Sequence, residues 1–173
     1  MKIGLLGGSF NPPHQGHIHI SELAFEKLNC DQIWWIPTAK NPFKEGIIYE
    51  NYENRLKKCQ NLTKNYKNIQ IKAFDEIYTE ELIKKLQNQY SDIDFIWIMG
   101  ADNFEKLHQW KNFKKLIMMI PFAVFSRGDF LKNIEKTEAF SLFYAKKDNK
   151  LPKLMMFDTK NLDVSSTKIR QND

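Results

Sequence analysis

The sequence has no apolar run close to the roughly 20 residues that a membrane-spanning helix needs. It has only 2 cysteines in 173 residues, Cys30 and Cys59, and they form no closely spaced pair. We therefore expect reduced thiols in a cytoplasmic protein. The apolar start of the chain is interrupted by Gly4, Gly7 and Gly8 and is followed by no cleavage site, so we expect no signal peptide.

Internal repeats, low-complexity segments and linkers are also missing, and the length suits one domain with a sizeable core. We expect a single domain over residues 1–173. The formal net charge is +5, but the lysines are dispersed among acidic residues instead of lining one element. That distribution favours a solvated surface over a nucleic-acid interface, although the charge alone leaves an anionic partner open.

Short apolar runs alternate with amphipathic stretches along the chain. The runs predict strands at Lys2–Leu6, Gln32–Pro37, Asn68–Phe74, Asp94–Met99, Pro121–Phe125 and Lys153–Phe157. The amphipathic stretches predict helices at Gly16–Leu28, Tyr52–Lys64, Thr79–Tyr90, Phe113–Met119 and from about Ser166. The longest irregular segments are expected at Lys40–Glu50 and Arg127–Glu138. This alternation predicts the α/β class, with a doubly wound, Rossmann-like domain around a mostly parallel sheet.

The junction between the first strand and the first helix reads GGSFNPPHQGH, residues 7 to 17. Gly7 and Gly8 have no Cβ, so the backbone can bring its N–H groups close to a ligand. The following helix points its first N–H groups and the positive end of its dipole at the same place. The two prolines stiffen the connection before anything binds. These features together predict a phosphate site.

His14 and His17 lie three residues apart at the start of this helix, so both rings face the same side of the first turn. Such a pair could ligate a metal, act as acid and base, or donate hydrogen bonds to phosphoryl oxygens. No third ligand follows at the spacing of a zinc site, so we expect no metal held by the protein. The alternative is that one histidine only caps the helix.

A second cluster, DVSSTKIR, lies at residues 163 to 170. Ser165 or Ser166 can cap a helix, and their hydroxyls with that of Thr167 and the first N–H groups would form another anion site. Arg170 lies four residues after Ser166 and could grip the same phosphate with two hydrogen bonds. By itself the cluster also fits an ordinary capped helix with a surface arginine.

Taken together, the two clusters resemble the HxGH nucleotidyltransferase superfamily. The middle of the chain is similar to nicotinate-nucleotide adenylyltransferases in four segments. These are Ile36-Pro37 with Asn41-Pro42-Phe43-Lys44, Tyr78-Thr79, Gly100-Ala101-Asp102-Asn103 followed by Trp110, and Phe125-Ser126-Arg127-Gly128. The resemblance covers residues 3 to 170 and implies the α/β fold of the nucleotidyltransferases.

The chain also departs from this family pattern at several positions. Asn11 replaces the commoner aspartate, Phe43 stands where a histidine is usual, and Lys111 replaces an aromatic residue that often follows the tryptophan. Glu81 replaces aspartate near Tyr78-Thr79, where the usual arginine, glycine and serine are missing. These departures concern the acceptor side and the loop of Lys44 more than the phosphate clusters.

The resemblance implies transfer of the adenylyl group of ATP to nicotinate mononucleotide, giving nicotinate adenine dinucleotide and pyrophosphate in NAD biosynthesis. It implies that His14, His17, Lys44 and Arg170 act on the reacting phosphates, with Mg²⁺ bound mainly through ATP. It implies substrate contacts at Gly7, Gly8, Ser9, Phe10, Thr79, Gly100, Asp102, Trp110, Arg127, Ser165, Ser166 and Thr167. An ordinary helix cap remains the alternative for Asp102, and a core position remains the alternative for Trp110. Trp34, Trp35 and Trp97, which fall within strands, are expected in the core.

Other functions remain open from the sequence. A related transferase could use nicotinamide mononucleotide or phosphopantetheine as acceptor, or could be a cytidylyltransferase, because these enzymes share the phosphate clusters. A nucleotide-binding module without turnover is a further alternative, and a nucleic-acid binder lacks the interleaved aromatic and basic residues it would need. No membrane partner is expected, and both a monomer and a homo-oligomer are compatible with the sequence.

Overall fold

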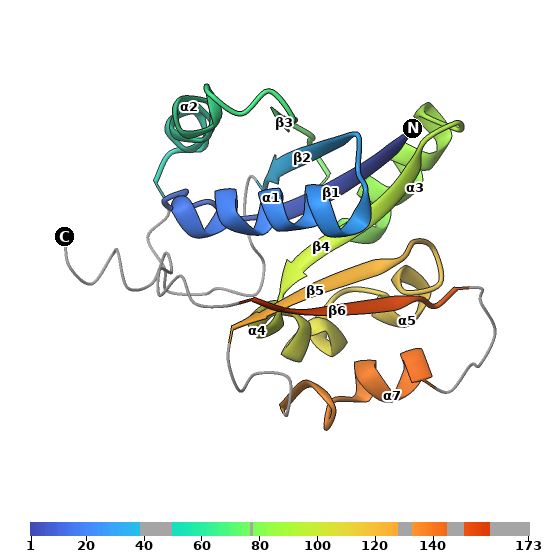
Figure 1. Ribbon diagram of the computed structural model, residues 1–173. Coiled ribbons are helices and arrows are strands. Elements are labelled where there is room, and N and C mark those ends of the chain that lie inside the picture. The colour runs from blue at the N-terminus through green and yellow to red at the C-terminus, as the bar shows by residue number, and fades with distance from the viewer. Residues whose placement is uncertain (39–49, 77, 128–132, 145–150, 160–173) are drawn as a thin grey trace. The chain divides into compact units, whose positions relative to one another are not determined.

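The computed structural model describes residues 1–38, 50–76, 78–127, 133–144 and 151–159 (Figure 1). The chain divides into two compact units, one built on Lys2–Ile77 and the other on Tyr78–Asn161. We call them the amino-terminal unit and the second unit and describe each by itself. Within the described residues no helix has both the length and the apolar character to cross a membrane.

The amino-terminal unit contains three parallel strands and two helices. In chain order they are β1 (Lys2–Gly8), α1 (Gln15–Leu28), β2 (Gln32–Pro37), α2 (Tyr52–Thr63) and β3 (Ile69–Ile71). The strands lie in the order β3-β2-β1, with Ile3 opposite Gln32 and Gly8 opposite Pro37. The paired strands β1 and β2 therefore end together, which brings the first junction of the chain to the carboxyl edge of this half of the sheet.

Burial explains why α1 packs where it does. Its buried residues Ile18, Ser21, Ala24 and Leu28 recur every three or four positions, so they form one face of the helix. Figure 1 shows α1 running along β1 and β2. The indole nitrogen of buried Trp35 on β2 donates to Ser21 Oγ at 2.7 Å, and Ser21 Oγ donates to the His17 carbonyl at 2.8 Å. The core of this unit is thus connected to the first turn of α1 by hydrogen bonds.

The second unit contains the other three strands, again parallel, in the order β4-β5-β6. Its elements are α3 (Thr79–Gln89), β4 (Asp94–Gly100), α4 (Ala101–Glu105), η1 (Leu107–Gln109), α5 (Phe113–Leu116), β5 (Phe122–Arg127), α7 (Glu138–Tyr144) and β6 (Leu154–Thr159). Residues Phe95 to Met99 of β4 are buried without alternation, as a strand covered on both faces requires. Phe122 of β5 packs edge-on against Phe143 of α7, with ring centroids 5.7 Å apart.

The predicted α/β class is confirmed by six strands whose described pairings are all parallel. The strand Gln32–Pro37 has the predicted bounds, whereas the strand predicted at Asn68–Phe74 is reduced to Ile69–Ile71. The helix predicted at Phe113–Met119 stops at Leu116. The irregular segment predicted at Arg127–Glu138 was too long, because Arg127 belongs to β5 and Glu138 begins α7. The helix predicted near Ser166 lies outside the described residues.

Both cysteines are free and buried. Burial raises the pKa of the Cys30 thiol to about 11 and that of the Cys59 thiol to about 12. Both therefore stay protonated at neutral pH and act as small apolar side chains of the core.

Candidate active site

The loop after β1 turns sharply toward α1. Phe10 has φ 45°, in the left-handed region that non-glycine residues seldom adopt, and its side chain is almost fully buried. Its ring stacks on Trp35 with the centroids 4.8 Å apart, so core packing holds the strained residue. The Phe10 ring, through this packing, thus fixes the turn.

His14 and His17 start α1 as a reciprocal capping box. His14 is the N-cap residue, and its Nδ1 accepts a hydrogen bond from the Gly16 N–H at 3.1 Å. The Nδ1 of His17 accepts from the His14 N–H, also at 3.1 Å. The motif usually pairs Ser or Thr with Glu or Gln, so two histidines in these places are a departure from the rule. Capping, considered above as an alternative to a functional role, is therefore something both rings do.

The cap also fixes what the two rings can offer to a ligand. Since both Nδ1 atoms accept, each neutral ring carries its proton on Nε2 and is a donor there. The ring centroids are 3.9 Å apart, and His17 also lies 4.7 Å from the Phe10 ring. The first turn of α1 contains no acidic residue. The start of α1 thus combines two imidazole donors with a positive helix end, a combination suited to phosphate.

Arg55, which was not predicted from the sequence, forms hydrogen bonds to the main chain of the loop after β1. It is 1% exposed, and its guanidinium donates to the carbonyls of Ser9, Thr38 and Glu50. Arg55 lies four residues before Cys59 and eight before Thr63, which are both buried on α2. This helical spacing, visible in the sequence, places the charged residue on the same buried face of the helix. Asn11 adds a second link, because its Oδ1 accepts from the Glu50 N–H at 3.1 Å. An aspartate at that position would offer the same acceptor, so the replacement by asparagine preserves this hydrogen bond.

Gly100 and Asp102 lie where β4 passes into α4, in the second unit. Gly100 is the N-cap residue of α4, and a Cβ built on it would lie 2.6 Å from Asp102 Oδ1. A larger residue at this position would make the Asp102 carboxylate move from its present place. Asp102 itself is exposed in the first turn of α4 and does not cap it, so the helix-cap alternative for Asp102 is wrong.

Trp110 follows the 3-10 turn η1 as its C-cap residue. It is half-buried and packs edge-on against Trp97 with the ring centroids 6.1 Å apart. Trp34, Trp35 and Trp97 are at most 4% exposed, and their predicted core positions are confirmed. Trp110 is more exposed than Trp97, against which it packs, as we expect of a ring that contacts a ligand.

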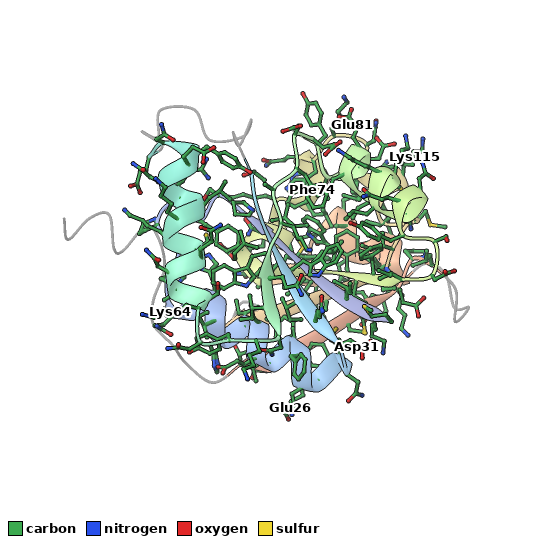
Figure 2. The ribbon with its side chains drawn as sticks, turned by 90° about the horizontal axis from the view of Figure 1, so that it is seen from above. Glu26, Asp31, Lys64, Phe74, Glu81 and Lys115 are labelled. Atoms are coloured by element: carbon green, nitrogen blue, oxygen red, sulfur yellow. The ribbon has the colours of Figure 1, made fainter. Side chains whose placement is uncertain are left out.

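Thr79 begins α3, and the segment around it is held by charged side chains. Buried Glu80 accepts from Asn112 Nδ2 at 2.6 Å and pairs with Lys84 at 2.7 Å and Lys115 at 3.3 Å. Hydrogen bonds from Lys84, and next from Asn112, lower the pKa of Glu80 to about 2. Figure 2 shows the neighbouring Glu81 and Lys115 on this side of the second unit.

Lys111, one of the departures from the family pattern, joins the same region. Its Nζ lies 3.9 Å from the centroid of the Tyr78 ring and 3.1 Å from Glu81 Oε1. Because Lys111 directly follows Trp110, these two contacts connect the segment of Trp110 with Tyr78 and Glu81 at the start of α3. At a position where an aromatic residue is common in the family, the lysine makes a cation–π contact and an ion pair.

Several predicted residues lie outside the described part of the chain: Lys44, Ser165, Ser166, Thr167 and Arg170. Arg127 ends β5, and its side chain is likewise not described. Of the others, the structure brings Gly7, Gly8, Ser9, Phe10, His14 and His17 together at the β1–α1 junction. In the second unit it places Thr79, Gly100, Asp102 and Trp110 at the starts or ends of their elements. The described residues contain no group of three His, Cys, Asp or Glu that could hold a metal ion.

Comparisons with known proteins agree with this description. The cytidylyltransferase-like family model matches residues 5–172. A protein of Agrobacterium fabrum named probable nicotinate-nucleotide adenylyltransferase is 33% identical over 99% of both chains. A Mesorhizobium japonicum protein of the same name is 34% identical over 86% of this chain and 78% of its own.

Solved structures match the fold as well. The nicotinic acid mononucleotide adenylyltransferase of Plasmodium falciparum, solved in complex with NaAD, has a TM-score of 0.77 at 18% identity. The match covers 98% of this chain and 82% of the other. The family model and the relatives thus lead to the same group: the chain belongs to the cytidylyltransferase-like family and, within it, to the nicotinate-nucleotide adenylyltransferases.

Proposed function

We propose that the chain transfers the adenylyl group of ATP to nicotinate mononucleotide and releases nicotinate adenine dinucleotide and pyrophosphate. The observation that carries the proposal is the histidine capping box of α1, which turns two Nε2–H donors and a helix start into one anion site. The relatives at 33% and 34% identity carry the name of this activity. The reaction is a step of NAD biosynthesis.

The chemistry needs donors more than it needs a protein nucleophile. An oxygen of the mononucleotide 5′-phosphate attacks the α-phosphorus of ATP, and the bond from that phosphorus to the oxygen leading to the β-phosphate breaks. Pyrophosphate leaves with that oxygen and with both bonding electrons. Negative charge shifts onto the phosphoryl oxygens during this exchange, and fixed donors stabilise it. His17 donates to the α-phosphoryl group, and His14 donates to the neighbouring phosphates.

The remaining phosphate contacts come from both ends of the chain. The backbone N–H groups of Gly8, Ser9 and Phe10 line the phosphate path beside Gly7. Following the resemblance, Lys44 neutralises phosphate charge, and the leaving β- and γ-phosphates are held by Ser165, Ser166, Thr167 and Arg170. Arg127 is assigned to the adenine or the ATP phosphates.

Mg²⁺ belongs to this scheme as part of the MgATP substrate. Magnesium bound to nucleotides keeps several waters and takes much of its coordination from phosphate oxygens. The described residues fit this role, because they offer no cluster of three ligating side chains that would hold an ion of their own. When bound, the ion neutralises charge on the triphosphate.

The acceptor end is assigned to the second unit. The half-buried Trp110 offers a ring face for the pyridine, and Thr79 offers a hydroxyl at the start of α3. Asp102, exposed beside Gly100, orients a ribose or the bound nucleotide and does not act as a base. Soluble nucleotides are the only partners required, so we place the enzyme in the cytoplasm without a nucleic-acid or membrane partner, as a monomer or a homo-oligomer.

The test is pyrophosphate release by the purified chain with Mg²⁺ and pairs of substrates. We expect release with ATP and nicotinate mononucleotide, and less with ATP and nicotinamide mononucleotide. Arms with CTP in place of ATP, and with phosphopantetheine as acceptor, test the other transferases of the family. Release only in one of those arms would replace the proposed substrates, and binding of ATP without release in any arm would leave a nucleotide-binding module.

A further inference from the structure

Arg55 occupies a position that charged side chains rarely take. It lies in the first turn of α2 and is 1% exposed, although arginine is almost never buried unless its donors are satisfied. No phosphate or pyridine role has been assigned to it above. Its hydrogen-bond partners therefore show what the residue does for the protein.

Three of the partners described for it are main-chain carbonyls from different segments of the amino-terminal unit. Nη1 donates to the Ser9 carbonyl and, at 2.9 Å, to the Thr38 carbonyl, while Nε donates to the Glu50 carbonyl at 3.1 Å. Ser9 directly follows β1, Thr38 directly follows β2, and Glu50 directly precedes the N-cap residue of α2. The planar guanidinium has donors in a rigid fork, so it fixes the three segments relative to one another.

The bond to Ser9 has a consequence on the other side of its peptide group. The Ser9–Phe10 peptide is trans, because the cis peptide bonds are Asn11–Pro12 and Leu151–Pro152. In a trans peptide the carbonyl of one residue and the N–H of the next point in opposite directions within one plane. Holding the Ser9 carbonyl toward Arg55 therefore aims the Phe10 N–H away from it.

The preceding peptide is fixed in the same manner. The Gly8 carbonyl accepts from the Thr38 N–H at 2.9 Å and from Thr38 Oγ1 at 3.3 Å. This aims the Ser9 N–H away from Thr38, whose own carbonyl is held by Arg55. Arg55 thus orients two successive amides. It orients the Phe10 amide directly, through the Ser9 carbonyl, and the Ser9 amide indirectly, through Thr38.

We propose that Arg55 is a positioning residue for phosphate binding: it orients the Ser9 and Phe10 amides that hold the nucleotide phosphates. The proposal rests on the proposed function only in taking those amides as phosphate donors. Arg55 does not touch the substrate, and it acts through the backbone. Lysine cannot replace it, because one ammonium group has no planar fork with which to hold three carbonyls.

The test compares Arg55→Lys and Arg55→Ala with the matched control Lys58→Met. Lys58 lies on the same helix and forms an exposed pair with Glu50 at 2.7 Å, so its loss should change kcat less than twofold. We expect Arg55→Lys to lower kcat by about 10- to 100-fold, the scale of a misplaced reacting group, with KM for the mononucleotide within about threefold. In Arg55→Ala, methylguanidinium should restore activity and methylammonium should not.

Thermal melting of each variant separates positioning from folding. A kcat of Arg55→Lys within about threefold of the unmodified chain would overturn the proposal. So would a loss of activity that follows the unfolded fraction and is not rescued by methylguanidinium. Calorimetric titration with MgATP separates this outcome from failure of the proposed function. If the unmodified chain binds MgATP but releases no pyrophosphate, an approximately tenfold weaker affinity of Arg55→Lys would still support the positioning role, and equal affinity would overturn it. If the unmodified chain does not bind MgATP, both proposals fail.

Discussion

The two units stabilise the surroundings of their site residues with buried groups of opposite charge. In the amino-terminal unit the cation Arg55 holds main-chain carbonyls beneath the loop that leads to His14 and His17. In the second unit the anion Glu80 accepts from Asn112 and pairs with Lys84 and Lys115 beside Thr79. A guanidinium does not lose its charge in the range where proteins are folded, whereas a carboxyl group can be protonated. The arrangement around Arg55 is therefore insensitive to pH in this range, whereas the arrangement around Glu80 is sensitive to it.

The largest expected effect is on the amino-terminal unit. His17→Ala should lower kcat by at least about 100-fold, because one preorganised donor to the reacting phosphate is lost. Its Nδ1 also serves the capping box, so stability must be measured beside activity. Gln15→Ala, an exposed change in the same turn, is the control. A folded His17→Ala protein with normal turnover would remove the imidazole from the mechanism.

A smaller effect is expected at the aromatic residue of the second unit. Trp110→Ala should raise KM for the mononucleotide about tenfold and leave KM for ATP nearly unchanged, because a stacking face for the pyridine is lost. Trp97→Phe keeps a core aromatic and serves as the control for the edge-on contact between the two rings. Steady-state kinetics with each substrate varied in turn give the measurement. If KM for ATP rose instead, Trp110 would belong to the nucleotide end.

The pH prediction tests the difference between the two buried charges. The pKa of Glu80 is about 2 in the folded chain against 4.5 for the unperturbed group, mainly because Lys84 donates to it. A lowered folded pKa stabilises the fold above pH 4.5, and that stabilisation is lost as the pH falls toward 2. Glu80→Gln should therefore flatten the dependence of Tm on pH in this interval. Glu81→Gln, which removes an exposed pair, should keep most of the slope. If Tm depended on pH with the same slope in the unmodified chain and in both variants, groups other than Glu80 would cause the acid sensitivity.

The smallest effect is expected at Lys111. Its ammonium contacts the Tyr78 ring and an exposed Glu81, so Lys111→Met should change the free energy of unfolding by less than about 1 kcal/mol. Lys111→Phe, which returns the aromatic residue commoner in the family, should be equally mild and should leave KM for the mononucleotide within about threefold. Chemical denaturation of both variants measures the stability term. A loss well beyond this scale would mean that Lys111 organises the acceptor side as Arg55 organises the phosphate side.

Much of the fold could be predicted because its strands are continuous apolar runs. The sequence favours a buried strand over any other element at Gln32–Pro37 and from Phe95 to Met99. The structure has a strand at both places. The short helix α7 was missed, because seven residues contain too few turns to show a helical period. The 3-10 turn η1 before Trp110 was not predicted, because three residues are too few to show a helical period.

Site residues could be predicted where their role follows from the residue type. They could not be predicted where their role depends on the folded geometry. Two histidines at spacing three are visible in a sequence, and so is GADN after an apolar run. The capping by His14 was seen only as an alternative, because histidine is not among the residues that usually cap helices. Arg55 belongs to no sequence motif, because the three acceptors described for its guanidinium are main-chain carbonyls, which every residue has.

The orientation of the Gly8 and Ser9 carbonyls, set by Thr38 and Arg55, has a consequence for resistance to inhibitors. Amide hydrogens are part of every residue except proline, so a point mutation that changes the side chain leaves them in place. A compound that binds through the Ser9 and Phe10 amides would be evaded only by a proline at one of these two positions or by mutations of the residues that hold the loop, such as Arg55. Such mutations would also impair the enzyme, and a drug designed against this backbone would therefore meet few viable escape variants.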